Sequence, residues 1–110
     1  MLVIEVREGE RVDAIKQSAK ERGVTDAAIV TLIGAVDSFT ISTMPANDAT
    51  KDIITDYDLP AEMSGTGAVV NGRVHIHATM AVEGDRAVNG HLHRVQIGTW
   101  FAGVYLLPGV

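Results

Sequence analysis

The sequence predicts an α+β domain built on an antiparallel sheet of about six or seven strands with one main helix. Two observations support this fold class. The hydrophobic pattern has a helical period only once, near the amino terminus, and the rest of the chain is rich in Val, Ile and Thr, which favour strands. In addition, Asn71-Gly72 stands between two strand-like segments, which is typical of a β-hairpin. The length of 110 residues indicates one domain over residues 1–110.

The amino-terminal part of the chain predicts one strand and then the helix. Residues 2–8, LVIEVRE, alternate between apolar and polar side chains and predict a strand. Residues 8–23, EGERVDAIKQSAKERG, predict a helix that ends at Gly23 as its C-cap. The apolar stripe of this helix consists of Val12, Ile15 and Ala19.

The middle of the chain predicts further strands and one loop. Residues 25–44 contain Gly34 near their centre, which predicts two strands or one strongly bent strand. The first half of this segment is almost wholly apolar, which predicts burial on both faces. Residues 44–52, MPANDATKD, predict a loop, and residues 53–58, IITDYD, a short strand.

The carboxy-terminal part predicts a hairpin, a second turn and a last strand. The hairpin joins residues 63–70 to residues 73–82, and residues 83–90, EGDRAVNG, form the second turn. Residues 95–107, VQIGTWFAGVYLL, form the final strand and are apolar on both faces. Since one helix covers only one face, we expect a second subunit to cover the other, and the chain to form an oligomer.

Composition narrows the possible functions. The net charge is −5, and the nine basic residues are scattered, which argues against direct DNA binding because phosphates require clustered cations. The absence of cysteine excludes disulfides, thiolate catalysis and Cys-ligated metals, so a metal would need His or carboxylate ligands. No signal peptide is evident, and the longest apolar run is about half of the roughly 20 residues that span a membrane. We expect a cytoplasmic protein without a membrane partner.

All four histidines lie in two His-x-His pairs, His75/His77 and His91/His93. Residues i and i+2 of a strand point to the same face, so His75 and His77 can converge on one ion while the intervening apolar residues face the core. A third ligand could come from either histidine after the following turn. The alternative is a polar strand face that happens to use imidazole, and the pattern alone leaves both readings open.

Glu83 is a second candidate site residue, in the predicted turn between the two pairs. Its carboxylate could be a metal ligand or a general acid/base, but a Glu before Gly-Asp is more often a solvated turn residue, and the same holds for Asp85. Neutral imidazole is the form that binds metals, so a histidine site should weaken as the pH falls through about 6.5.

Nearly the whole chain resembles the PPC domain, a domain conserved in plants and prokaryotes. The resemblance is carried by GERVDAIKQSAKERGV, by AAIVTLIGAVDSFTI and above all by VHIHATMAVEGDRAVNGHL, which is similar to a family pattern of His-x-His-Ala, a short acidic turn and Gly-Gly-His-Leu. In this sequence Asn89 replaces the first Gly of the Gly-Gly-His-Leu pattern. The family also has a Glu before a strand that begins with Ser-Gly, and Glu62 lies near that place but at a different spacing.

The resemblance implies a homotrimer with the fold of the PPC domain and of acetolactate decarboxylase. That fold class includes acetolactate decarboxylase and a zinc-dependent ester hydrolase, and both enzymes bind zinc with a His-x-His pair and a later His. The corresponding residues here are His75, His77 and His91, and His93 lies outside the motif. In plant members the domain comes after an AT-hook, a basic segment that binds DNA. Prokaryotic members that consist of the domain alone are labelled DNA-binding because they are related to the plant proteins. This chain has no such hook. A cupin is the alternative fold, but the amino-terminal helix and the lack of a second metal motif count against it.

Three functions follow as hypotheses. The first is a homotrimeric binding or assembly module with a divalent metal, zinc, at the histidine cluster and a small-molecule ligand beside it. The second is a zinc-dependent lyase or hydrolase acting on a small carbonyl or carboxylate compound, with Glu83 or another subunit's carboxylate as acid/base. The third, a DNA-binding regulator, depends on the family label.

Overall fold

The protein is described by a computed structural model that covers residues 1–6 and 13–109. One helix and eight strands are described, so the α+β class is confirmed and the number of strands exceeds the predicted six or seven. Their bounds are β1 (Leu2–Val6), α1 (Asp13–Glu21), β2 (Ala27–Val36), β3 (Ser38–Thr43), β4 (Ile53–Tyr57), β5 (Ala61–Val70), β6 (Arg73–Val82), β7 (Arg86–Gln96) and β8 (Ala102–Pro108). The predicted start of the helix, with Val12, lies outside the described residues, as does Arg7 of the predicted first strand.

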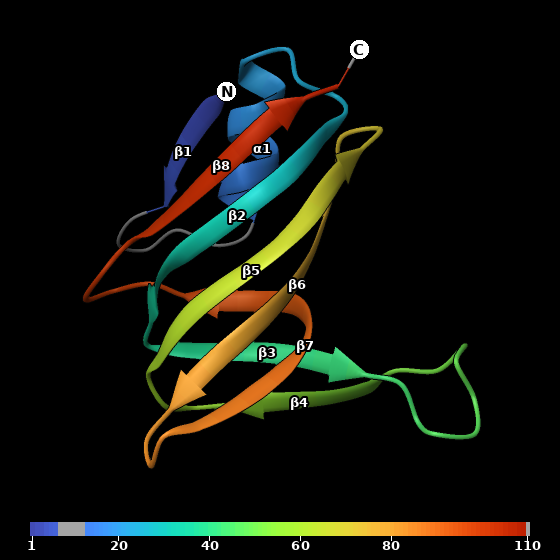
Figure 1. Cartoon of the computed structure of the whole chain (residues 1–110), viewed down its shortest axis with the longest axis vertical. Helices are drawn as coiled ribbons and strands as arrows, with labels where there is room; N and C mark the ends of the chain where they lie inside the picture. The colour runs from blue at the N-terminus through green and yellow to red at the C-terminus, as the bar shows by residue number, and fades with distance from the viewer. Residues whose placement is uncertain (7–12, 110) are drawn as a thin grey trace.

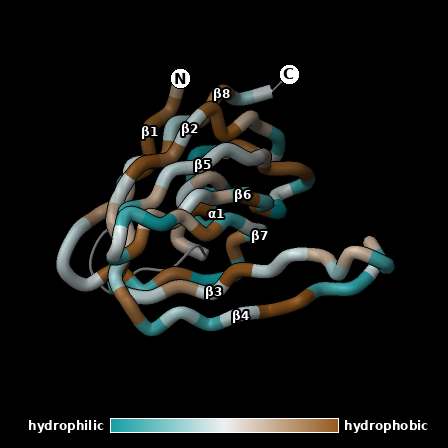
Figure 2. The backbone as a smooth tube through the Cα atoms, turned by 60° about the horizontal axis from the view of Figure 1, so that its bottom comes forward, coloured by the Kyte–Doolittle hydropathy of each residue, from teal (hydrophilic) through white to brown (hydrophobic). Residues whose placement is uncertain are grey.

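The strands form one sheet in the order β1-β8-β2-β5-β6-β7-β3-β4, and all neighbouring strands are antiparallel. The sheet is strongly twisted, so β3 and β4 run across the direction of β2 and β5 (Figure 1). A second view separates β3 and β4 from the layer of β1, β2 and β5 (Figure 2). No helix among the described residues is long and apolar enough to cross a membrane.

The core lies on the face of the sheet that α1 covers. Ile15 and Ala19 of α1 are buried together with apolar side chains from the strands. Strand β6 shows the alternation that the sequence predicts, since Ile76, Ala78 and Met80 are buried while His75 and His77 are exposed. The histidines therefore lie on the opposite face of the sheet, here called the outer face.

The break predicted at Gly34 lies instead at Asp37, between β2 and β3. Gly34 remains inside β2 and pairs with Ala102 of β8. A Cβ atom at this position would lie 2.4 Å from the carbonyl oxygen of Phe101, so glycine permits a close approach of two strands. The glycine is therefore explained by the close packing of β2 against β8. Of the two alternatives that the sequence left open, two separate strands are observed rather than one bent strand.

The first hairpin is confirmed, whereas the second turn and the final strand differ from the prediction. Asn71 and Gly72 have φ values of 50° and 77°, as a tight hairpin turn requires. The second turn is confined to residues 83–85, and the following residues to Gly90 belong to β7. Residues 95–107 are divided between β7 and β8, because residues 97–101 leave the sheet.

The outer face carries exposed apolar side chains around β2 and β8. The prediction that the first half of β2 is buried on both faces is wrong for the single chain, since Val30 and Ile33 are exposed. Val3 of β1 and Leu107 of β8 are exposed as well. We call the surface formed by Val3, Val30, Ile33 and Leu107 the apolar outer patch.

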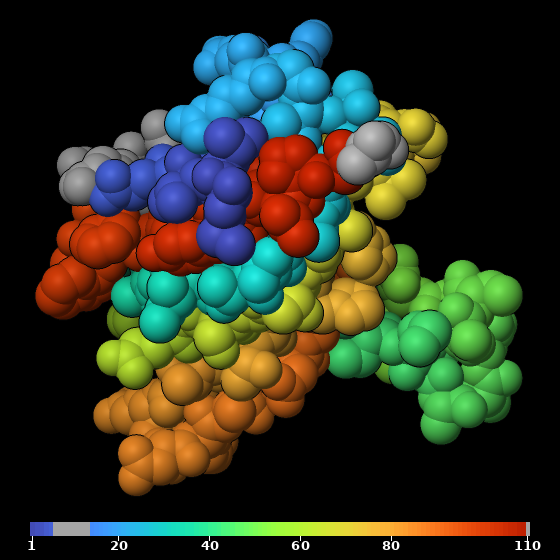
Figure 3. Space-filling view, turned by 45° about the horizontal axis from the view of Figure 1, so that its top comes forward, coloured from blue at the N-terminus to red at the C-terminus, as the bar shows by residue number. Residues whose placement is uncertain are grey.

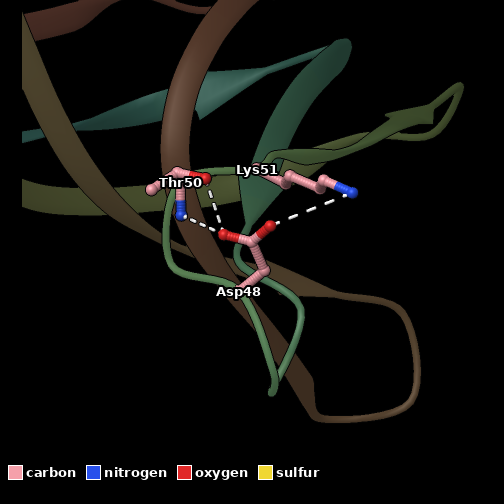
Figure 4. Close-up of polar contacts among 3 residues, drawn as sticks. All are labelled: Asp48, Thr50 and Lys51. Carbon is pink, nitrogen blue, oxygen red and sulfur yellow. Dashed lines mark hydrogen bonds and ion pairs between the residues drawn. The ribbon is translucent and has the colours of Figure 1, made fainter.

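The loop between β3 and β4, residues 44–52, projects from the body of the molecule (Figures 1 and 3). Asp48 organises this loop (Figure 4). Its Oδ1 accepts hydrogen bonds from the backbone N and the Oγ1 of Thr50, at 2.9 and 2.6 Å, and its Oδ2 lies 3.9 Å from Nζ of Lys51. The hydrogen bonds from Thr50 lower the pKa of the Asp48 carboxyl because they stabilise its charged form.

Candidate metal centre

Three of the four histidines converge on one point of the outer face. His75 and His77 project from β6, and His91 lies directly opposite His77 on β7. Their potential ligand atoms all lie within 4.8 Å of one another, and the Nε2 atoms of His75 and His77 are 3.0 Å apart. Nitrogens bound to a tetrahedral zinc at 2.0–2.1 Å are about 3.3 Å apart, so small side-chain rotations would close the set around one ion.

The fourth histidine occupies a β-bulge beside this triad. Thr40 of β3 pairs with Arg94, while the next residue, Ile41, pairs with Leu92, which leaves His93 as the extra residue. Nε2 of His93 lies 2.7 Å from Oγ of the buried Ser42, and its ring centroid is 4.6 Å from that of His91. His93 therefore adjoins the triad but is held by Ser42, outside the group of convergent ligand atoms.

Strand β7 can approach β3 closely next to the triad because residue 90 is glycine. A Cβ atom there would lie 2.6 Å from the carbonyl oxygen of Ser42. Asn89, which replaces the family's first Gly, is a strand residue that pairs with Thr79. The Oγ1 of Thr79 donates a hydrogen bond of 2.5 Å to Oδ1 of Asn89, so this replacement is accommodated without a turn at that position.

The triad opens into a groove of about 970 Å³ on the outer face. The groove reaches from β2 across β5, β6 and β7 to β3 and the base of the projecting loop, where Asp52 lines it. Figure 3 shows the loop standing away from the strands of the body, with a notch between them. All four histidines line the groove, so an ion at the triad would be accessible to a small molecule.

The surroundings of His91 favour its neutral, metal-binding form. Partial burial lowers the pKa of His91, and the positive charges of His75, His93 and His77 lower it further. The negative charge of Asp52 opposes these effects. The net direction of the pKa shift is downward, so the His91 imidazole remains unprotonated at pH values where an isolated histidine begins to protonate.

We predict that His91 of the metal-free protein titrates below 6.5, and that the variant His75→Gln moves its pKa upward because one neighbouring positive charge is removed. Heteronuclear NMR of the imidazole Cε1–H resonances across pH 4–8 measures both values. Stability has a matching dependence. Since the pKa is lower in the folded protein, unfolding becomes easier as the pH falls from about 6.5 toward the folded pKa. A His91 midpoint above 6.5 would contradict this account.

The other sequence candidates lie away from the triad. Glu83 is exposed in the turn between β6 and β7, where its carbonyl oxygen accepts a hydrogen bond of 3.4 Å from Nε of Arg86. It is six residues beyond His77, which is about 20 Å along a strand, and it does not line the groove. Asp85 has φ 57° in the same turn, and Glu62 is exposed on β5 opposite Ala81.

Two residues of the site could not be identified from the sequence. Ser42, the partner of His93, and Asp52, which lines the groove, lie far from the histidines in the chain. Only the long-range pairing of β3 with β7 brings Ser42 to the site, and a single sequence does not reveal such a pairing.

Solved structures share this fold. A candidate DNA-binding protein from Ralstonia eutropha is 20% identical, with a TM-score of 0.83, over 97% of this chain and 76% of that chain. A metal-containing protein from Archaeoglobus fulgidus is 21% identical, with a TM-score of 0.80, over 99% of this chain and 81% of that chain. A plant- and prokaryote-conserved (PPC) protein from Pyrococcus horikoshii is 21% identical, with a TM-score of 0.80, over 98% and 79%.

The match to a protein family covers almost the entire sequence. No curated protein matches the chain. The family described as the Plants and Prokaryotes Conserved (PCC) domain matches residues 1–107, which include β1 to β7 and nearly all of β8. The resemblance seen in the sequence is thus confirmed, and the chain belongs to the family of the plants and prokaryotes conserved domain.

Proposed function

We propose that this chain is a binding and assembly module of its family in which His75, His77 and His91 hold one divalent cation, zinc. The observation that carries the proposal is that three imidazoles each bring a potential ligand nitrogen within 4.8 Å of the others at an open groove. Neutral imidazole is a preferred zinc ligand, and the lowered pKa of His91 favours that form. The relative from Archaeoglobus fulgidus is a metal-containing protein, which supports a metal in a domain of this fold.

Elemental analysis of tag-free protein after incubation with excess zinc and removal of unbound metal tests this proposal. We expect about one zinc per chain. The His93→Ala variant should retain it, because His93 bonds to Ser42 rather than belonging to the triad. A wild-type protein that takes up no metal would contradict the proposal and leave the histidines as a polar strand face.

A second candidate function is a zinc-dependent enzyme acting on a small carbonyl or carboxylate compound. Three protein ligands leave a coordination position free, and zinc in such a site polarises carbonyls or activates water. The groove gives a small molecule access to that position. Glu83 of the same chain is about 20 Å from His77 along β6, so its use as acid/base would require the turn of another subunit. Decarboxylation or ester hydrolysis that requires zinc and the triad would favour this function.

We also propose that the assembly is a homotrimer in which the apolar outer patch is covered by another subunit. Apolar side chains gathered on one face are typical of a protein interface. The Ile33→Arg variant should therefore shift the mass in light scattering from about three times 11.7 kDa toward that of one chain. Ile54→Arg is a matched control, since Ile54 of β4 is equally exposed, at 61%, but lies outside the patch. A wild-type monomer would contradict the trimer.

Direct DNA binding is not part of the proposal. The net charge of −5 opposes it, and Arg94, one of the exposed cations, lies 3.6 Å from the Asp56 carboxylate. The observation in favour of DNA binding is the name of the relative from Ralstonia eutropha.

A further inference from the structure

We infer that the groove selects small ligands by charge, so that a ligand bound to the triad metal has an uncharged or cationic far end, and anionic ends are disfavoured. The inference depends on the proposed metal site and names the chemical class of its ligand. Compounds with a metal-binding oxygen and a hydroxyl- or amine-bearing tail fit this class, whereas phosphorylated compounds and polycarboxylates do not.

The charge of the groove wall is the first argument. Apart from the histidines, Asp52 is the only ionisable residue that lines the groove, and none of the described lining residues is lysine or arginine. Phosphates and carboxylates are usually bound by Arg or Lys, because fixed cations offset the cost of removing an anion from water. Apart from the metal and the histidines, this wall offers an anion no such compensation.

The cations that lie close to lining residues in the sequence do not provide this compensation. Lys51 adjoins Asp52 in the chain, but its Nζ lies 3.9 Å from the carboxylate of Asp48 on the projecting loop (Figure 4). Arg94 follows His93, but its guanidinium lies near Asp56, on the side of a separate smaller pocket. Arg73 is two residues before His75 on the same face of β6, at the end of the strand and outside the groove lining.

Neutral hydrogen-bonding groups fill most of the polar wall. Each hydroxyl can both donate and accept a hydrogen bond, and the amide of Asn89 does the same. Such a wall can bind the hydroxyls of a neutral ligand or the N–H groups of an ammonium group. The hydroxyl-bearing residues that line the groove are Thr31, Ser42, Thr43, Ser64, Thr66 and Thr79.

Asp52 determines which charge the groove prefers in a ligand. It lies at the base of the projecting loop and lines the same groove as the triad. An ammonium group in the groove would be attracted by this carboxylate, and a second carboxylate would be repelled. For an exposed charge pair of this kind we expect about a three- to fivefold change in affinity.

Three hydroxamates with the same metal-binding group and the same chain length test the inference. Isothermal titration of the zinc-loaded full chain would compare γ-aminobutyrohydroxamate, butyrohydroxamate and succinic monohydroxamate, whose far ends are cationic, neutral and anionic. We expect affinity to fall in that order, by about three- to fivefold at each step. In the Asp52→Asn variant the advantage of the amine should disappear. Asp58→Asn, a matched change of an exposed carboxylate outside this groove, should preserve it.

The outcomes separate this inference from the proposed function. Equal affinities, or tightest binding of the succinic compound, would overturn the charge selection while the metal site stands. An amine preference that survives Asp52→Asn would overturn the role of that carboxylate. If the wild-type chain takes up no zinc, both the inference and the proposed function fail.

Discussion

Replacing His75 and His77 together by alanine is expected to reduce the bound zinc from about one per chain to below about one-tenth and to weaken zinc affinity at least about a thousandfold. A four-ligand zinc site binds with about 10–16 kcal/mol, so each ligand carries on the order of 3 kcal/mol, and a factor of ten corresponds to about 1.4 kcal/mol. Competition with a chromophoric chelator at pH 7.5 measures the affinity. This effect is the largest that the site predicts.

The fold of this double variant should survive, which makes the result interpretable. Both side chains are exposed on the outer face, so the metal-free variant should unfold within about 0.5 kcal/mol of the metal-free wild type. The His93→Ala variant controls for the loss of a neighbouring imidazole and should keep its zinc. If the double variant still binds one zinc tightly, the cation is held elsewhere and the triad is not its ligand set.

Truncating Ile76 to alanine should lower the free energy of unfolding by about 2–5 kcal/mol. Ile76 is 1% exposed and lies between the two histidines of β6, pointing to the opposite face. Removal of these side-chain atoms leaves a cavity in the core under the histidine triad, and a domain of this kind is stable by only about 5–15 kcal/mol. Urea denaturation followed by circular dichroism measures the change, at one fixed protein concentration because association would add to the stability.

The Ile54→Ala variant is the control for this truncation. Ile54 is 61% exposed, so the same chemical change should alter the free energy of unfolding by about 0.5 kcal/mol or less. A loss below about 1 kcal/mol for Ile76→Ala would mean that the alternation of β6 does not place this side chain in the core.

Local periodicity explains why much of the fold was predictable. The alternation in residues 73–82 assigned His75 and His77 to one face and Ile76 to the other, as observed. Asn71-Gly72 fixed the hairpin because few other residue pairs adopt φ values of 50° and 77° easily. The structure also brings together the triad that the resemblance implied, since His91 pairs with His77.

Features that depend on distant pairing were not predictable. The bulge at His93 arises from the register between β3 and β7, so the sequence could not show that this residue would meet Ser42. Trp100 and Phe101 suggested a continuing strand because they are apolar, yet they lie in the exposed segment before β8. Gly34 suggested a bend, but its pairing partner on β8 determines its role as a point of close packing.

The histidine triad and the groove around it differ in how far apart along the chain their residues lie. The triad comes from residues 75–91, two strands joined by a short turn, whereas Thr31, Ser42 and Asp52 reach the groove through distant pairings. A mutation in the segments of β2, β3 or the projecting loop can therefore alter what the groove accepts without removing a histidine of the triad. Selection could change the ligand specificity of such a domain while the histidine triad is inherited intact on one hairpin.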